Sequence, residues 1–113
     1  QIAERSLSVL YDRMIAYHAQ MERILGLDLS TLDEGAKQTV LEHAAVLAYL
    51  AQDVLSSPPA NADGDADYAV LSGAMQASVD QLLTAARAGD DAAIKAAIGG
   101  LKVPYSKCFL KFG

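Results

Sequence analysis

Two methionines and a histidine share one face of the first predicted helix. Met14, His18 and Met21 stand at positions i, i+4 and i+7, so a helix would place their side chains on one side. Thioether and imidazole groups form a ligand set that suits copper. Cys108, the single cysteine of the chain, could reach the same interior from the last predicted helix. The pattern therefore raises the hypothesis of a copper site formed by Met14, His18, Met21 and Cys108.

The same spacing is also typical of a helix that packs in a bundle. On this interpretation, which we favour, Met14 and Met21 are core residues and His18 lies at the flank of the buried face. His43, in the second predicted helix, is interpreted as a surface residue. Haem held without a covalent link would need an axial ligand from His18, His43, a methionine or Cys108. The spacing selects no pair of these residues across the bundle, so we do not expect haem.

The sequence lacks the motifs of the common enzyme classes. It contains no G-x-S-x-G, no phosphate-binding glycine loop and no H-E-x-x-H, and neither histidine follows a glutamate at the spacing that di-iron bundles use. One cysteine excludes a disulfide within the chain and any site built from several cysteines of one chain. We therefore expect no enzymatic activity.

Four amphipathic segments must position these residues. The helical spacing of their apolar side chains predicts helices at residues 2–25, about 31–55, about 67–88 and 91–112. A connection of about eleven residues, rich in proline and short polar side chains, separates the second helix from the third. The prediction is an all-α single domain over residues 1–113, folded as an antiparallel up-down-up-down four-helix bundle.

Each predicted helix has a stripe of residues expected to face the core. These residues are Leu7, Leu10, Met14, Tyr17, Met21 and Ile24; Val40, Ala44, Leu47, Ala51 and Val54; Val70 or Leu71, Met75, Val79, Leu82 and Ala86; and Ile94, Ile98, Leu101, Tyr105, Cys108 and Phe112. Helix ends are expected at a capping box of Thr31 and Glu34, at Gly89, and at Asp90 as the cap of the last helix. Gly99, Gly100 and Pro104 interrupt that last helix and predict a kink near Gly100 to Leu101.

Charge is distributed unevenly along the chain. Nine bases and 14 acids give a net charge of −5, so a nucleic-acid partner held through phosphate contacts is not expected. No apolar run approaches the roughly 18 residues of a membrane span, so we expect no membrane insertion. The last nineteen residues carry +4 and the first 94 carry −9. This polarity could orient an acidic partner, but lysines near a helix C-terminus also interact favourably with the helix dipole, and we prefer that explanation.

The C-terminal segment contains the run Ala88 to Gly99, followed by Tyr105-Ser106-Lys107-Cys108-Phe109. From Gly89 to Gly113 these residues resemble the last helix of the cytochrome c-prime family, which ends in C-x-x-C-H. Helix order, the long second connection and the glutamine at position 1 extend the resemblance loosely over the whole chain. The resemblance implies a left-handed four-helix bundle in a bacterial periplasm, and a homodimer through the first two helices.

The chain departs from the family motif at two of the three haem-binding positions. The first haem-linking cysteine of the family falls on Tyr105, the second on Cys108 and the proximal histidine on Phe109. A phenylalanine ring offers iron no lone pair, so we expect no covalent haem. Tyr105, Phe109, Leu110 and Phe112 would instead add apolar bulk where the family places the porphyrin.

These observations favour a non-enzymatic periplasmic bundle that works as a binding or interaction module. Its partner would be an unknown protein or a small ligand, with copper as the first candidate, held between the first and last helices. A homodimer would use exposed apolar residues such as Tyr11, Ile15 or Tyr49. Two alternatives stay open: an electron-transfer or gas-binding cytochrome that holds haem non-covalently, and a purely structural bundle with a filled haem pocket.

Overall fold

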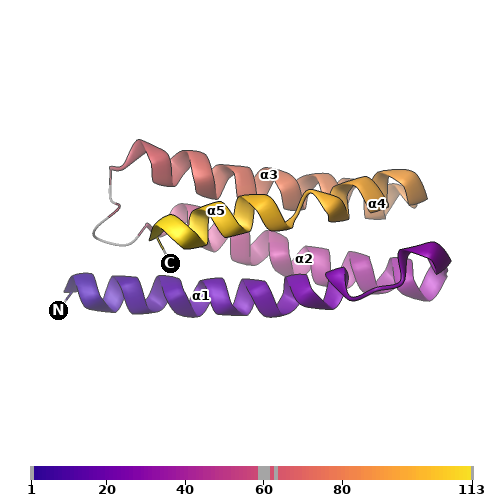
Figure 1. Ribbon diagram of the computed structural model, residues 1–113, viewed down its shortest axis with the longest axis horizontal. Coiled ribbons are helices and arrows are strands. Elements are labelled where there is room, and N and C mark those ends of the chain that lie inside the picture. The colour runs from indigo at the N-terminus through magenta and orange to yellow at the C-terminus, as the bar shows by residue number, and fades with distance from the viewer. Residues whose placement is uncertain (1, 59–61, 63, 113) are drawn as a thin grey trace.

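The apolar stripes of the sequence correspond to five α-helices. In the computed structural model, which describes residues 2–58, 62 and 64–112, these are α1 (Ile2–Leu25), α2 (Glu34–Ser56), α3 (Ala66–Ala88), α4 (Asp91–Gly99) and α5 (Lys102–Phe112), with a 3-10 helix η1 (Leu29–Thr31) after α1 (Figure 1). The described residues contain no strand, which confirms the all-α class. Residues 59–61 and 63 of the predicted connection, and the side chain of Leu7, lie outside the described part.

The helices lie along one long axis of a molecule that measures 48 × 21 × 19 Å (Figure 1). α2 packs against α1 and α3, and α3 packs against both α4 and α5. The backbones of α1 and α5 approach each other over only a short stretch. Large side chains must therefore fill the seam between these two helices. None of the helices described combines the length and the apolar character needed to cross a membrane.

The start of α2 differs from the capping prediction. Asp33 is the N-cap, and its carboxylate accepts a hydrogen bond from the backbone N–H of Ala36 at 2.8 Å. Thr31 belongs to η1, so the predicted capping box of Thr31 and Glu34 is wrong. The 3-10 turn moves the start of the helix three residues along the chain, and the aspartate that then stands in front of it takes over the cap.

The other predicted helix ends agree with the structure. α3 ends at Gly89 in the left-handed conformation, with φ 69°, and Asp90 caps α4 by accepting a hydrogen bond from the N–H of Ala93 at 3.2 Å. The predicted kink lies at the break between α4 and α5. Pro104 stands in the first turn of α5, where a backbone N–H has no partner within the helix. The last predicted helix is thus two helices, and its proline costs no helical hydrogen bond.

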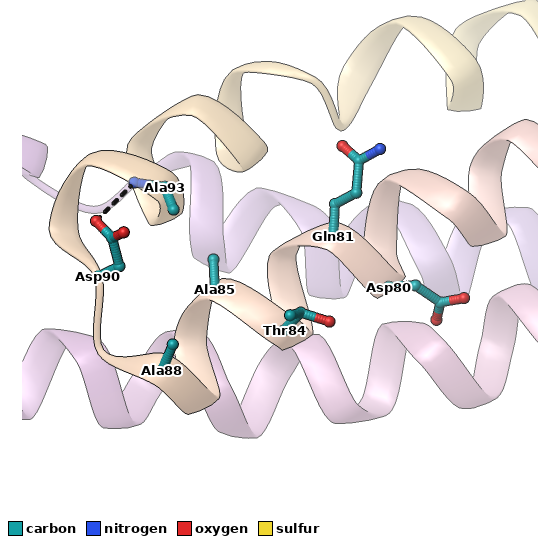
Figure 2. Close-up of a pocket in the computed structure, with 7 residues that line it drawn as sticks. All are labelled: Asp80, Gln81, Thr84, Ala85, Ala88, Asp90 and Ala93. Carbon is teal, nitrogen blue, oxygen red and sulfur yellow. Dashed lines mark hydrogen bonds between the residues drawn. The ribbon is translucent and has the colours of Figure 1, made fainter.

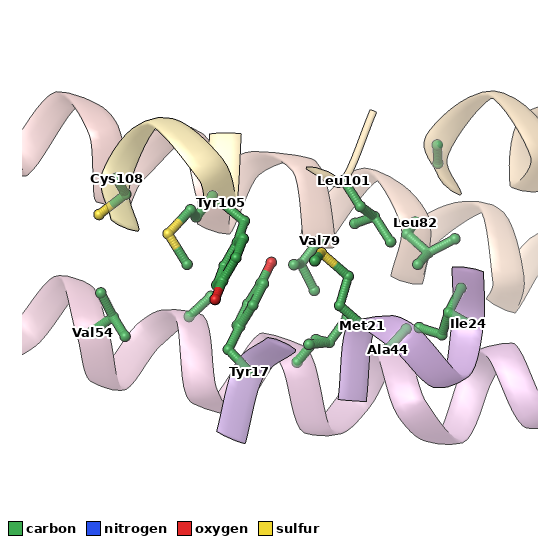
Figure 3. Close-up of a cluster of buried hydrophobic side chains, with 14 of the residues drawn as sticks. Tyr17, Met21, Ile24, Ala44, Val54, Val79, Leu82, Leu101, Tyr105 and Cys108 are labelled. Carbon is green, nitrogen blue, oxygen red and sulfur yellow. The ribbon is translucent and has the colours of Figure 1, made fainter. Parts of the chain in front are cut away.

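The predicted stripes make up most of the core in the described residues. Buried are Leu10, Met14, Tyr17, Met21 and Ile24 of α1; Val40, Ala44, Leu47, Ala51 and Val54 of α2; Met75, Val79, Leu82 and Ala86 of α3; and Ile94, Ile98, Leu101, Tyr105, Cys108 and Phe112 of the last two helices (Figure 3). Of the two alternatives at the start of α3, Leu71 packs against the core and Val70 is exposed. Tyr68, which the prediction omitted, is buried and donates a hydrogen bond to the carbonyl of Val54.

Candidate functional site

Three aromatic rings fill the seam between α1 and α5. Tyr17 and Tyr105 stack with their ring centroids 5.5 Å apart and their planes 3° from parallel, and Figure 3 shows the two rings face to face between the helices. Phe109 continues the stack at 5.8 Å from Tyr105, with an angle of 7°. We call Tyr17, Tyr105 and Phe109 the aromatic stack. It occupies the space that the sparse backbone contact of α1 and α5 leaves between them.

The aromatic stack leads from the core to the surface. Tyr17 is fully buried, Tyr105 is 6% exposed, Phe109 is half-buried, and Tyr11, 50% exposed, adds a fourth ring 6.1 Å from Phe109. Burial raises the pKa of the Tyr17 and Tyr105 hydroxyls, so both are neutral at physiological pH. Tyr105 donates a hydrogen bond to the carbonyl of Met14 at 3.3 Å, whereas the hydroxyl of Tyr17 has no partner in the described part of the chain.

The residues matched to the haem motif do not offer haem chemistry. Cys108 is fully buried, and burial raises the pKa of its thiol to about 11. Such a thiol is protonated at neutral pH and is a poor nucleophile and a poor metal ligand. Tyr105 and Phe109, at the other two positions, are members of the aromatic stack. At these three positions a covalently attached haem would find one thiol and no imidazole nitrogen.

The prediction that four bulky residues of α5 fill the interior is wrong for one of them. Leu110 is 85% exposed, because the buried face of α5 carries Tyr105, Cys108 and Phe112 and places Leu110 on the opposite side. Phe112 is buried at the end of the helix, where it meets Tyr68 edge to face at 5.1 Å. The filling of the seam next to the haem-motif positions thus comes from α1 as well as α5.

The candidate copper ligands on α1 lie in two different environments. Met14 and Met21 are fully buried in the core, as the bundle interpretation requires. The His18 side chain is 46% exposed, its Nε2 atom lies 3.1 Å from Glu22 Oε1, and its ring packs against Tyr105 at 5.6 Å. No group of three or more histidine, cysteine, aspartate and glutamate side chains within the described residues could hold a metal ion.

His43 has a structural role that the sequence did not predict. It is half-buried, and its Nδ1 atom lies 2.7 Å from Gln20 Oε1, so the ring donates a hydrogen bond from α2 to α1. The interpretation of His43 as a surface residue is therefore only partly correct. Periodicity identified the side of α2 on which His43 lies, but it contained no signal for the glutamine opposite.

A shallow groove between α3 and α4 was also not predicted. It encloses about 490 Å³ and is lined by Asp80, Gln81, Thr84, Ala85, Ala88, Asp90 and Ala93 (Figure 2). The alanines leave the hollow because their side chains are too small to fill it. One oxygen of Asp90 already accepts the capping hydrogen bond from Ala93, drawn in Figure 2. The aspartates at the rim would favour a cationic group over an anion.

No protein-family model, no curated protein and no solved structure matches this chain. The resemblance to cytochrome c-prime therefore depends on the residue pattern alone. Two members of the aromatic stack, Tyr105 and Phe109, and the buried Cys108 stand at the positions that carry this pattern.

Proposed function

We propose that this chain is a haem-free bundle of the cytochrome c-prime type, with antiparallel up-down-up-down topology, that acts in the periplasm as a non-enzymatic interaction module. The observation that carries the proposal is the aromatic stack, because two of its three members, Tyr105 and Phe109, stand at positions that match the haem motif and fill the seam with protein side chains. The reversals of the chain after α1, α2 and α3 in Figure 1 support the topology.

A binding role fits the surface better than catalysis does. Three titratable groups of the seam, Tyr17, Tyr105 and Cys108, are buried, and the pKa of each is raised away from neutrality. They therefore hold their protons at physiological pH, whereas general acid and base catalysis needs a pKa near the working pH. Large apolar side chains such as Tyr49 and Leu110 are exposed, and contacts with a protein partner could cover them.

The first experiment measures haem and metal in the protein purified from the periplasm of a haem-replete host. We expect no Soret absorbance and no stoichiometric metal by elemental analysis. A stoichiometric haem would contradict the proposal and favour the alternative, a cytochrome that holds haem non-covalently. The matched variant is the double substitution Tyr105→Cys and Phe109→His, which restores C-x-x-C-H together with Cys108. We expect this variant to gain covalent haem when the haem-attachment machinery is present.

Copper is the other candidate ligand, and a titration with Cu(I) tests whether the protein binds it. Wild type is compared with a Met14→Ala/His18→Ala variant. Because the two methionines are buried and His18 contacts Glu22, we expect no stoichiometric binding. Uptake of one copper ion that the variant loses would instead establish a copper-binding function on α1.

A further inference from the structure

One face of α5 exposes lysines and large aliphatic side chains together. Val103, Lys107 and Leu110 stand at i, i+4 and i+7 and therefore share the side of the helix opposite its buried residues. Val103 is 58% exposed and Leu110 is 85% exposed. Lys102, one position before Val103, is also exposed, and it lies about 100° around the helix from Val103, at the edge of this side. We call Val103, Lys107 and Leu110, with Lys102 at their edge, the basic face of α5.

The lysines of this face keep their charge uncompensated. Lys111, on the flank toward α3, forms an ion pair with Asp67. Lys102 and Lys107 form no ion pair with any described residue, and the last nineteen residues of the chain contain no acid. Because the other 94 residues carry −9, Lys102 and Lys107 are cations without a described ion-pair partner on an acidic molecule.

The combination of the two side-chain types matters more than either alone. A single exposed leucine is ordinary on a protein surface. Two exposed aliphatic side chains within two helical turns, beside unpaired lysines, form the apolar centre and charged rim of a protein interface. The helix dipole explains why lysines are favourable late in α5, but it does not explain the exposed Val103 and Leu110.

We propose that the basic face of α5 docks a protein partner that presents an apolar patch bordered by aspartate and glutamate. The inference rests on the proposed function as an interaction module and names the surface and the chemistry of the partner. A second copy is a poor occupant, because a two-fold contact through this face would bring Lys107 of each copy together. An anionic membrane is also disfavoured, because the acidic remainder of the molecule would oppose its approach.

The test uses a synthetic peptide with leucines along one helical face and glutamates beside them. Its binding is followed by fluorescence anisotropy and by amide chemical shifts of the labelled protein. We expect shift changes concentrated in residues 102–111 and an affinity that falls as salt is raised from low to physiological strength. A peptide of the same composition in scrambled order is expected to bind at least about tenfold more weakly, since it cannot present leucines and glutamates together.

Matched variants separate this surface from general charge attraction. Lys107→Glu and Leu110→Ser are each expected to weaken binding at least about tenfold. Arg87→Glu makes the same charge change at an exposed position of α3, and Val70→Ser removes another exposed valine, so both should bind like wild type. All four positions are exposed, and circular dichroism confirms that each variant is folded.

Three outcomes would overturn the inference. These are equal losses in the Arg87→Glu and Lys107→Glu variants, shift changes outside α5, and binding to phosphatidylglycerol vesicles without binding to the peptide. Haem content is measured on the same preparations. If the protein is haem-free but does not bind the peptide, only the proposed docking surface is contradicted. If the protein contains haem, the proposed function is contradicted.

Discussion

Replacement by phenylalanine should have opposite effects on stability at the two stacked tyrosines, Tyr17 and Tyr105. Tyr17 is fully buried and its hydroxyl has no hydrogen-bond partner in the described part of the chain, whereas Tyr105 donates to the Met14 carbonyl. An unpaired buried hydroxyl is destabilising, and a hydrogen bond contributes about 1 kcal/mol. Tyr17→Phe should therefore leave the free energy of unfolding unchanged or raise it by up to about 1 kcal/mol, and Tyr105→Phe should lower it by about 1 kcal/mol. Urea unfolding followed by circular dichroism measures both.

Truncation of Tyr105 to alanine removes the whole ring and should lower the free energy of unfolding more than the loss of the hydroxyl alone. Removal of a buried aromatic ring costs about 3–5 kcal/mol, because the transfer free energy is lost and a cavity remains. Tyr105→Ala also exposes the faces of Tyr17 and Phe109 that now stack on the ring. A loss below about 1 kcal/mol would show that the aromatic stack does not hold α1 to α5.

Alkaline pH should destabilise the protein through its buried thiol and its buried tyrosine hydroxyls, and Cys108 and Tyr68 are two of these groups. Burial raises the pKa of Cys108 from 9.0 to about 11 and that of Tyr68 from 10.0 to about 12. The folded state thus favours the protonated forms, so their contribution is complete below pH 9.0 and declines as pH rises toward 11 and 12. The free energy of unfolding of wild type should fall over this range. Cys108→Ala should flatten the part between 9.0 and 11, and an unchanged pH dependence in the variant would exclude the thiol as its source.

The helical periodicity of the sequence predicted which residues of the candidate site are buried, but not which side chains meet across the bundle. Helical spacing placed Met14, Met21 and Cys108 in the core, and it allowed His18 to lie at the flank, where its side chain is found. It did not indicate that Tyr17 meets Tyr105. Ring stacking across the bundle depends on the offset between two neighbouring helices, and that offset is not encoded in the spacing of either one.

At the scale of the helices, two glycines should respond oppositely to the addition of a methyl group. A Cβ on Gly99, the last residue of α4, would meet nothing within 4 Å, and glycine is a poor helix former. Gly99→Ala should raise the free energy of unfolding by about 0.5–1 kcal/mol. Gly89 has φ 69°, where an L-residue is strained, so Gly89→Ala should lower it by about 1–2 kcal/mol. Thermal unfolding measures both, and a destabilised Gly99→Ala would mean that the break before α5 needs that glycine.

The helices themselves were predictable because each carries a long apolar stripe. Gly89, Asp90 and the break near Gly100 also agreed, since a left-handed glycine and a helix-breaking pair act locally. The start of α2 did not agree. Thr31 and Asp33 are both good caps, and the choice between them depends on the 3-10 turn of η1, whose formation the sequence pattern does not reveal.

At the scale of the whole molecule, α1 and α2 form the pair through which we expect a homodimer. Besides their backbone packing, Arg13 of α1 forms an ion pair with Asp53 of α2 at 2.8 Å, which links the two helices. Ile15 and Tyr49, at 45% and 73% exposure, are two of the exposed apolar residues of these helices, beside Tyr11 and Val46. A dimer through these helices would leave α5 free for another partner.

The dependence on salt distinguishes self-association through α1 and α2 from the binding of a partner to α5. Each copy carries −5, so added salt should strengthen self-association by screening the repulsion, whereas it should weaken the binding of an acidic peptide to Lys107. Tyr49→Glu and Ile15→Glu each place a charge in the apolar contact, and sedimentation equilibrium should then find monomers. Val70→Glu makes the same kind of change on α3 and should leave the dimer intact. A dimer that survives the first two substitutions would place the self-contact on another face, and the exposed apolar residues of α1 and α2 would then remain open to solvent.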